Sequence, residues 1–496
     1  MKIKSTVAKV LARLNEKKMA KWRDNPIQAQ ENVLAQLIAQ GKNTQFGRDH
    51  KFESIHKHLD FKNAVPVRSY EDYSDYLPDL IAGKNDVFWP GKPLYFAKTS
   101  GTTSGAKYIP LTKESLKYQI GAAKMALLNY IFETGKADYV DGKMIFLQGS
   151  PLLNKNSVIP TGRLSGIVAN FVPGYLQSNR LPSFETNCIE DWESKVDAIV
   201  NETSQKDLRL ISGIPSWVQM YFEKLQEEHD GKNIKEIFPN FNLFVYGGVN
   251  YKPYKEKFTE LIGIEVDSIE LFPASEGFFA FQDSQSDLGM LLLVDSGIFY
   301  EFIPVEECHN ENPTRLTLKD VELNKDYALI ISTNAGLWAY NIGDLVRFTS
   351  LKPYRIVVSG RIKHFTSAFG EHVIAFEVEK AMNVGIESCG GSIREFHVAP
   401  EVNPTNGLPY HEWLIEFDTL PNDLDRFTQV IDEKMQELNP YYLDLRAGNI
   451  LKELVVTQIS RFGFQSYMKS QGKLGGQNKV PRLSNDRKIA DFLKGY

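Results

Sequence analysis

The sequence predicts an α/β protein of two domains, a larger one over residues 1–355 and a smaller α+β one over residues 356–496. The chain has 496 residues, which is more than one compact domain usually holds. Strand-like and helix-like segments alternate from about residue 65 to residue 355, as in an α/β fold. The pattern changes at Lys352-Pro353, and shorter elements follow.

Composition narrows the function classes. Hydrophobic residues make up 42% of the chain and charged residues 24%, which is typical of a globular protein in water. A net charge of -5 does not favour nucleic acid, and no apolar stretch is long enough to span a bilayer. Three scattered cysteines argue against a disulfide scaffold and favour a reducing compartment. We therefore expect a cytoplasmic monomer with no nucleic-acid or membrane partner.

The first fifty residues are predicted to be helical. Asn25-Pro26 offers a cap and a first-turn proline, and Gly41 ends the helix that follows. Val33, Leu34, Leu37 and Ile38 form one apolar stripe, which is most simply a packing face. Further along, Thr112 is expected to cap a helix that runs through residue 128.

Buried strands are predicted over 94–97, 144–147, 243–246, 264–272, 327–332 and 345–348. Several end in turns of small residues, and open α/β sheets bind ligands at such strand ends. The smaller domain is predicted to have strands over 354–358, 395–399 and 413–417, with helices over 375–382 and 424–438.

The strongest local motif is Ser100-Gly-Thr-Thr-Ser-Gly-Ala-Lys107. A loop dense in Gly, Ser and Thr can direct backbone N–H groups and hydroxyls at an anion, and Lys107 can add positive charge. It is not a Walker A loop, because Ala106 precedes the lysine and Tyr108 follows it. Taken alone, a phosphate loop and a plain surface loop fit this stretch equally well.

Two further motifs follow strand-like runs. Glu276 in Pro273-Ala-Ser-Glu-Gly277 could hold Mg²⁺ near phosphates, and Asp344 in Tyr340-Asn-Ile-Gly-Asp344 could bind ribose hydroxyls. Each motif alone is more simply a turn next to a strand.

Two basic segments could belong to a moving part. Gly360-Arg-Ile-Lys363 lies where the sequence character changes and fits either a hinge or a linker. Lys479-Val-Pro-Arg482 follows Gly475-Gly476 and fits either a lysine that reaches an anionic intermediate or a solvated basic loop.

Other chemistries lack their motifs. The sequence has no HExxH zinc motif, no GxSxG nucleophile motif and no GxGxxG dinucleotide motif, and its nine histidines do not cluster.

The order of the motifs resembles the adenylate-forming superfamily of acyl-CoA synthetases, adenylation domains and luciferases. Within it, the details resemble the GH3 family of acyl acid amido synthetases. The stretch from Ser100 to Pro110, Ser275-Glu276, and Tyr340-Asn-Ile-Gly-Asp344 match that family's three motifs, and Gln477-Asn-Lys-Val-Pro-Arg482 resembles its C-terminal motif. Asn43-Thr-Gln-Phe-Gly47 resembles a segment of its bacterial members.

The resemblance implies a fold and a set of roles. It implies α/β sheets plus a β-barrel in the larger domain, and a mobile C-terminal lid. Glu276 would ligate Mg²⁺, Asp344 would hold the ribose, and Lys479 would swing in with the lid, so Lys479, Lys107 and Glu276 are the expected catalytic residues. The phosphates would be surrounded by Ser100, Gly101, Thr102, Thr103 and Ser104, and the adenine bordered by Gly248, Ala274 and Ser275.

The sequence departs from the family pattern at two positions. Plant members carry a lysine where this chain has Gly370-Glu-His-Val-Ile374, so His372 could take that role. Asn341 stands where the third motif more usually has Arg.

The resemblance implies that a carboxylic acid reacts with ATP and Mg²⁺ to give an acyl-AMP, and that an amine, for instance an amino acid, then forms an amide and AMP. An acyl-CoA ligase is the nearest alternative, and a non-catalytic nucleotide-binding protein is a second. The acid and the amine are not identified by the sequence; Trp217, Phe171 and Tyr175 fit either an acyl pocket or core packing.

Overall fold

The computed structural model describes residues 3–102, 105–155, 157–171, 179–189, 192–248, 251, 255–287, 289–308, 310–361, 365–366, 368–371, 373–471 and 480–495. Thr103, Ser104, Tyr175, His372 and Lys479, named above as candidates, lie outside these residues.

The N-terminal helices support the large sheet. Helix α2 (Pro26–Gly41) begins and ends as predicted and buries its apolar stripe, with Val33 and Leu37 nearly inaccessible. The expected cap is wrong in one respect, because the Asn25 side chain donates to the Lys21 carbonyl instead of capping α2. The other helices of this region are α1 (Ile3–Arg23), α3 (Gln45–Asp49), α4 (His58–Ala64) and α5 (Leu77–Ile81).

The largest sheet has eleven strands among the described residues, in the order β11-β12-β13-β14-β10-β9-β8-β7-β6-β3-β5. The strands are β3 (Lys143–Phe146), β5 (Arg180–Leu181), β6 (Leu208–Ser212), β7 (Leu243–Gly247), β8 (Asp267–Pro273), β9 (Phe278–Gln282), β10 (Met290–Leu292), β11 (Ile298–Pro304), β12 (Asp326–Thr333), β13 (Tyr340–Leu351) and β14 (Tyr354–Arg361).

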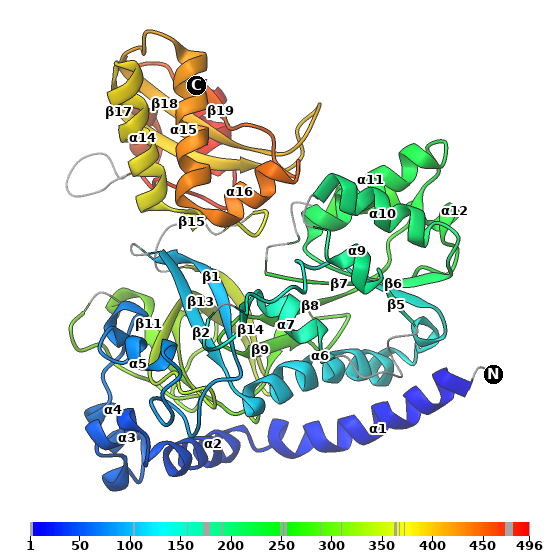
Figure 1. Ribbon diagram of the computed structural model, residues 1–496, viewed down its shortest axis with the longest axis vertical. Coiled ribbons are helices and arrows are strands. Elements are labelled where there is room, and N and C mark those ends of the chain that lie inside the picture. The colour runs from blue at the N-terminus through cyan, green and yellow to red at the C-terminus, as the bar shows by residue number, and fades with distance from the viewer. Residues whose placement is uncertain are drawn as a thin grey trace.

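The sheet has two halves of different direction. Strands β5, β3, β6, β7 and β8 pair in parallel, as predicted for an α/β fold. From β8 through β14 to β11 the pairing is antiparallel, so the strands expected in a barrel continue the same sheet here. A separate three-stranded sheet, β2-β1-β4, lies beside the antiparallel half (Figure 1); its strands are β1 (Tyr95–Thr102), β2 (Gly105–Leu111) and β4 (Thr161–Gly162).

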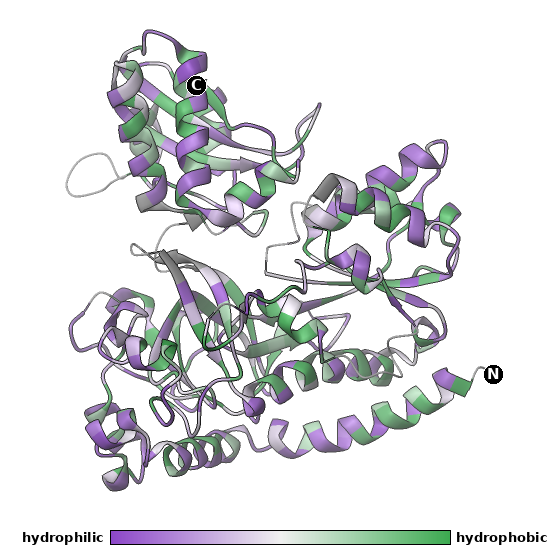
Figure 2. Ribbon diagram, in the orientation of Figure 1, coloured by the Kyte–Doolittle hydropathy of each residue, from purple (hydrophilic) through white to green (hydrophobic). Residues whose placement is uncertain are grey.

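Helices cover both faces of the parallel half. Helix α6 (Lys113–Thr134) packs on one face, and its Thr112 cap accepts from the Ser115 N–H as the sequence predicted. Helices α10 (Trp192–Thr203) and α11 (Pro215–Glu228) lie on the other face (Figure 1), where α13 (Lys255–Ile262) shares their hydrophobic cluster. Small helices α7 (Leu164–Ala169), α9 (Phe184–Asn187) and α12 (Ile234–Ile237) complete these layers. Hydrophobic colour follows the strands of this sheet in Figure 2, whereas α1 shows alternating hydrophilic and hydrophobic bands.

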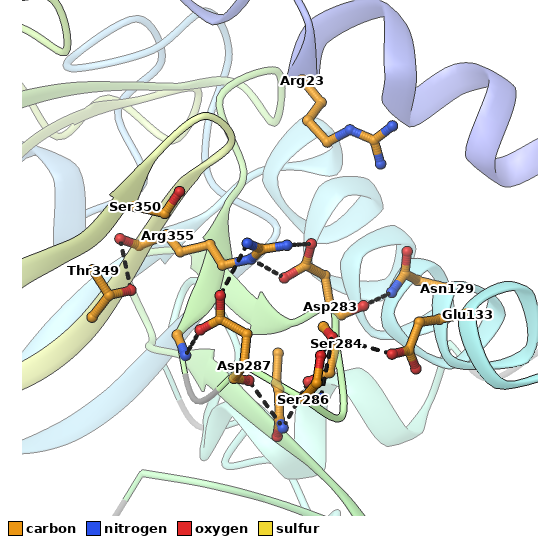
Figure 3. Close-up of polar contacts among 12 residues, drawn as sticks. Arg23, Asn129, Glu133, Asp283, Ser284, Ser286, Asp287, Thr349, Ser350 and Arg355 are labelled. Carbon is orange, nitrogen blue, oxygen red and sulfur yellow. Dashed lines mark hydrogen bonds and ion pairs between the residues drawn. The ribbon is translucent and has the colours of Figure 1, made fainter.

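Strand β14 crosses the domain boundary expected at residue 355 and pairs with β13 as far as Arg361. Its Arg355 forms a bidentate ion pair with Asp283 at 2.7 and 3.0 Å and reaches Asp287 at 3.1 Å (Figure 3). These contacts fix β14 to the turn between β9 and β10.

The C-terminal part is an α+β unit, as predicted. Its sheet has the order β17-β18-β19, from β17 (Ser392–Glu401), β18 (Tyr410–Thr419) and β19 (Val455–Gln458), and β15 (Phe365–Thr366) with β16 (Val373–Ile374) forms a small ribbon before it. Helices α14 (Ala375–Cys389) and α15 (Leu424–Leu438) cover one face of the sheet, and α17 (Gly463–Ser470) and α18 (Lys488–Gly495) belong to the separate cluster on the other. Helix α16 (Pro440–Ala447) follows α15 at the side facing the large sheet (Figure 1).

None of the described helices combines the length and apolar character needed to cross a bilayer.

Candidate active site

The carboxyl ends of the parallel strands gather the candidate residues at one edge of the sheet. Strand β7 ends at Gly247, which pairs with Leu271 of β8 so closely that a Cβ would lie 2.4 Å from the Leu271 carbonyl oxygen. Gly248 follows with φ +81°, a conformation that glycine adopts without strain. The two glycines therefore turn the chain away at the sheet edge where α/β proteins bind ligands.

Ser275 and Glu276 form the two-residue tip of the hairpin between β8 and β9. The Ala274 N–H donates to the Gly277 carbonyl at 2.7 Å, and the Gly277 N–H returns to the Ala274 carbonyl at 3.2 Å. Gln119 of α6 also donates to the Ala274 carbonyl at 2.9 Å. The helix that follows the phosphate motif thus fixes the turn that carries Glu276.

Lys107 on β2 meets Tyr340, the first residue of β13. The Lys107 ammonium donates to the Tyr340 hydroxyl at 3.3 Å and lies 5.6 Å from the ring centroid of Tyr70 and 5.9 Å from that of Tyr340. Tyr70 is held in turn by the Tyr108 N–H, which donates to its hydroxyl at 2.9 Å. The lysine is therefore positioned by two aromatic rings from segments far apart in sequence.

Glu276 belongs to the same cluster. Burial raises the pKa of the Tyr340 phenol well above its usual range, and the negative charge of Glu276 raises it further. Tyr340 therefore stays a neutral hydroxyl that can donate as well as accept. A lysine, a neutral phenol and a half-buried carboxylate converge here from β2, β13 and the β8–β9 turn.

The Ser/Thr/Gly motif is a hairpin rather than an open loop. Strand β1 extends through Ser100, Gly101 and Thr102, whose side chains lie outside the description, and Thr102 is opposite Gly105 of β2. Thr103 and Ser104, the expected tip, lie outside the described residues.

The third motif is also part of a strand, so the simpler reading of a turn between strands is wrong. Tyr340 to Asp344 open the twelve-residue strand β13, and Asp344 is 5% exposed and opposite Arg361 of β14. Asn341 accepts the Gly343 N–H on its side-chain oxygen at 2.9 Å, and Gly343 has φ +86°. The departure at Asn341 thus closes a local turn within the strand, which the sequence pattern did not predict.

Arg482, at the end of the C-terminal motif, has a structural role. Arg482 pairs with Glu379 and Glu395 and stacks on Phe396, and its carbonyl accepts the Val398 N–H at 2.9 Å. These contacts join the segment after Lys479 to β17. Arg482 is therefore held by the chain and is not part of a solvated basic loop, which was one of the two interpretations of this segment.

Two residues of the candidate site were not predicted from the sequence. Tyr70 lies 37 residues before Lys107 and Gln119 lies 155 residues before Ala274, and neither belongs to a motif. An aromatic or amide side chain gives no local signal of such long-range contacts.

Three domain models of one known family match this chain. The GH3 family N-terminal domain matches residues 15–171, the GH3 family central domain matches residues 291–361, and the GH3 family C-terminal domain matches residues 376–488.

The chain is also similar to curated proteins that are named as amido synthetases. The probable indole-3-acetic acid-amido synthetase GH3.1 of Arabidopsis thaliana is 22% identical, covering 94% of this chain and 90% of the relative. The jasmonoyl--L-amino acid synthetase JAR4 of Nicotiana attenuata is 21% identical over 64% of this chain and 66% of its own length.

Solved structures share the fold. The GH3.15 acyl acid amido synthetase superposes with a TM-score of 0.61 at 16% identity, covering 98% of this chain and 96% of that one. A 2-hydroxyisobutyryl-CoA ligase in complex with 2-HIB-AMP and CoA has a TM-score of 0.58 at 14% identity, covering 96% and 92%.

Proposed function

The chain belongs to the GH3 family, and we propose that it joins a carboxylic acid to an amine, for instance an amino acid, through an acyl-AMP intermediate made from ATP. The observation that carries the proposal is the convergence of Lys107, Tyr340 and Glu276 beside the carboxyl ends of the parallel strands. Full-length relatives named as amido synthetases support the same chemistry.

We assign the phosphates of ATP to the β1–β2 hairpin, where Ser100, Gly101, Thr102, Thr103 and Ser104 would offer N–H groups and hydroxyls. The adenine would lie by Gly248, Ala274 and Ser275, and the buried Asp344 would accept from the ribose hydroxyls. Lys107 is close enough to the hairpin tip to add positive charge at the phosphates.

Mg²⁺ is part of the proposal, with Glu276 as its ligand. The described residues contain no group of three or more His, Cys, Asp or Glu side chains that could hold a metal ion alone. This fits Mg²⁺, which usually retains waters and binds one or two carboxylates together with substrate phosphates. When bound, the ion would neutralise part of the phosphate charge.

The chemistry then has two half-reactions. An oxygen of the substrate carboxylate attacks the α-phosphorus of ATP, and pyrophosphate leaves. A neutral amine next attacks the acyl carbon, the bond between that carbon and the AMP oxygen breaks, and the amine nitrogen loses a proton. The acyl-AMP is a reactive anhydride, so water must be kept from it between the two steps.

We propose that the smaller C-terminal part acts as a mobile lid that serves both half-reactions, bringing Lys479 to the site in one of them. The boundary expected at residue 355 is better placed after β14, since that strand pairs within the large sheet. We further propose that the enzyme works as a cytoplasmic monomer on small-molecule substrates.

A thiol acceptor is the second candidate, because the 2-hydroxyisobutyryl-CoA ligase shares this fold. The acceptor and the acid can be identified together. Purified protein with ATP and Mg²⁺ is tested for pyrophosphate release over a panel of aryl, indolyl and aliphatic acids, and the best acid is then offered amino acids and CoA in competition.

We expect acid-dependent pyrophosphate release and an amide in the product mass spectrum. A thioester as the main product would assign the second candidate. No acid-dependent pyrophosphate across the panel, despite ATP binding, would leave a non-catalytic nucleotide-binding protein.

A further inference from the structure

Helix α16 joins the C-terminal part to the strand that leads into the phosphate hairpin. The Tyr441 hydroxyl donates to the Lys98 carbonyl at 3.1 Å, and Lys98 lies on β1, two residues before Ser100. One turn further along α16, Asp444 forms an ion pair with Arg163. Residues three apart share one face of a helix, so Tyr441 and Asp444 contact the N-terminal part together.

Arg163 lies at the centre of this contact. It follows β4, which pairs in parallel with β1 at Gly162 and Ala97, so Arg163 and Lys98 are the next residues of two neighbouring strands. Its guanidinium carbon is 5.1 Å from the centroid of the Tyr441 ring. Its Cδ also packs on Gly149, just beyond β3, where a Cβ would come within 2.9 Å. Arg163 therefore touches the exit of a parallel strand and α16 at the same time.

Helix α16 is fixed within its own part of the chain. The Asn439 side-chain oxygen caps it by accepting from the N–H groups of Tyr441 and Tyr442, and the Asn439 amide donates to the Glu371 carbonyl at 3.0 Å. Glu371 is fully buried, and its carboxylate lies 2.9 Å from Nε2 of His411. The position of α16 is thereby coupled to the segment at 368–371 that follows the expected hinge.

That segment also reaches the sheet edge. A Cβ on Gly370 would lie 3.1 Å from Cδ1 of Ile214, two residues after the end of β6. The C-terminal part thus meets the candidate site at two places, Gly370 beside the end of β6 and α16 beside β1.

We propose that Arg163, Tyr441 and Asp444 form a latch that positions the C-terminal part for acyl transfer rather than for adenylation. The proposal rests on the proposed function. If the phosphates of ATP lie at the β1–β2 hairpin as proposed, pyrophosphate leaves from that hairpin in the first half-reaction. Helix α16 lies against β1, the strand that leads into this hairpin. The acyl-AMP needs cover from water only after pyrophosphate has left, so the latched arrangement suits the second half-reaction.

The test separates the two half-reactions in the full-length enzyme. Adenylation is measured as carboxylate-dependent exchange of labelled pyrophosphate into ATP. Transfer is measured as single-turnover amide formation from acyl-AMP, together with AMP released without amide. The variants are Asp444→Asn, Arg163→Met, Tyr441→Phe and the charge swap R163D with D444R. Asp326→Asn serves as the matched control, since it breaks the distant ion pair with Arg347.

The ion pair is partly exposed, with the Arg163 and Asp444 side chains 34% and 51% accessible. Removing either charge is expected to slow transfer about five- to tenfold and to raise unproductive AMP release, while exchange stays within about twofold. Tyr441→Phe should slow transfer about two- to threefold, the swap should recover part of the loss, and Asp326→Asn should change neither rate.

Exchange that falls as much as transfer, or a swap that is no better than the single variants, would overturn the latch. These outcomes are distinct from failure of the proposed function, in which the unaltered enzyme itself would show no carboxylate-dependent exchange.

Discussion

Strand β9 carries acidic turns at both of its ends, and the two turns differ in how their charge is balanced. At its start, Glu276 lies half-buried on a two-residue turn beside the neutral phenol of Tyr340 and near Lys107. At its end, Asp283 and Asp287 are both bound by Arg355, and the Asp283 carbonyl accepts from Asn129 of α6 at 2.7 Å (Figure 3).

The two ends of β9 show how a carboxylate that we propose for the site differs from one that holds two strands together. A guanidinium that binds a carboxylate through two parallel hydrogen bonds supplies both the donors and the positive charge that the carboxylate needs. The ion pair of Asp283 with Arg355 therefore holds β14 at the end of β9. Glu276 instead lies on a half-buried turn, where its charge acts on Tyr340. On the proposed function, removal of that charge should affect chemistry before stability.

The largest expected effect follows from changing Glu276→Gln. The substitution keeps the shape and removes the charge that Mg²⁺ would need, so pyrophosphate exchange should fall about 10²- to 10³-fold. The melting temperature should stay within about 2 °C, because glutamine has nearly the shape of glutamate and the side chain is only half-buried on a turn. The matched control is Asp283→Asn at the other end of β9, which should lower stability and retain exchange.

If Glu276→Gln kept near-normal exchange, or if Asp283→Asn lost exchange while remaining folded, the assignment of the two turns would be reversed. Circular dichroism of both variants at the assay temperature separates these results from unfolding.

A carboxylate on the neighbouring strand sharpens the comparison further. Glu270 of β8 lies opposite Tyr246 of β7, and within the described part of the chain its carboxyl group has no ion pair. Burial raises the pKa of Glu270 to about 7. The folded state therefore holds a proton that the unfolded state has released between pH 4.5 and 7, so stability from this group falls as pH rises through that window.

Glu270→Gln should remove the penalty that the ionised carboxylate imposes. The variant should be more stable than the unaltered protein by about 2–3 kcal/mol at pH 8, and the difference should shrink towards zero near pH 4.5. Urea unfolding at several pH values measures it. A difference that does not change with pH would show that Glu270 ionises normally.

A smaller effect is expected from Arg355→Met. The change leaves Asp283 and Asp287 without their cation, and the free energy of unfolding should fall by about 2 kcal/mol because the pair is only partly buried. Arg347→Met is the control, since its ion pair with Asp326 is more exposed and should cost under about 1 kcal/mol. Equal losses in urea unfolding would mean that Arg355 adds nothing beyond a surface pair.

The same contrast shows what the sequence could predict. The helix over 26–41, the Thr112 cap and the strands ending near Gly247 and Pro273 follow from periodicity and local turn chemistry, and the structure confirms them. The motif order led to the GH3 family, which the family models confirm.

Long-range pairing was not predictable. Arg355 was placed at the domain boundary, but its partners lie about seventy residues away on another hairpin, and no local pattern reports such a contact. Tyr340 to Asp344 was more simply a turn because Gly-Asp is common in turns; the paired strands β12 and β14 override that local preference. His411 is buried against Glu371 because β18 carries it inward, and no local sequence pattern predicts that contact.

The central claim is that an acyl-AMP forms at the edge marked by Glu276. The most direct measurement uses a carboxylic acid labelled with ¹⁸O in both carboxylate oxygens and follows the label by mass spectrometry of the products. Attack on the α-phosphorus predicts one ¹⁸O in AMP for each amide formed, and none in pyrophosphate. Unlabelled AMP, or label in inorganic phosphate with ADP as the nucleotide product, would contradict the account.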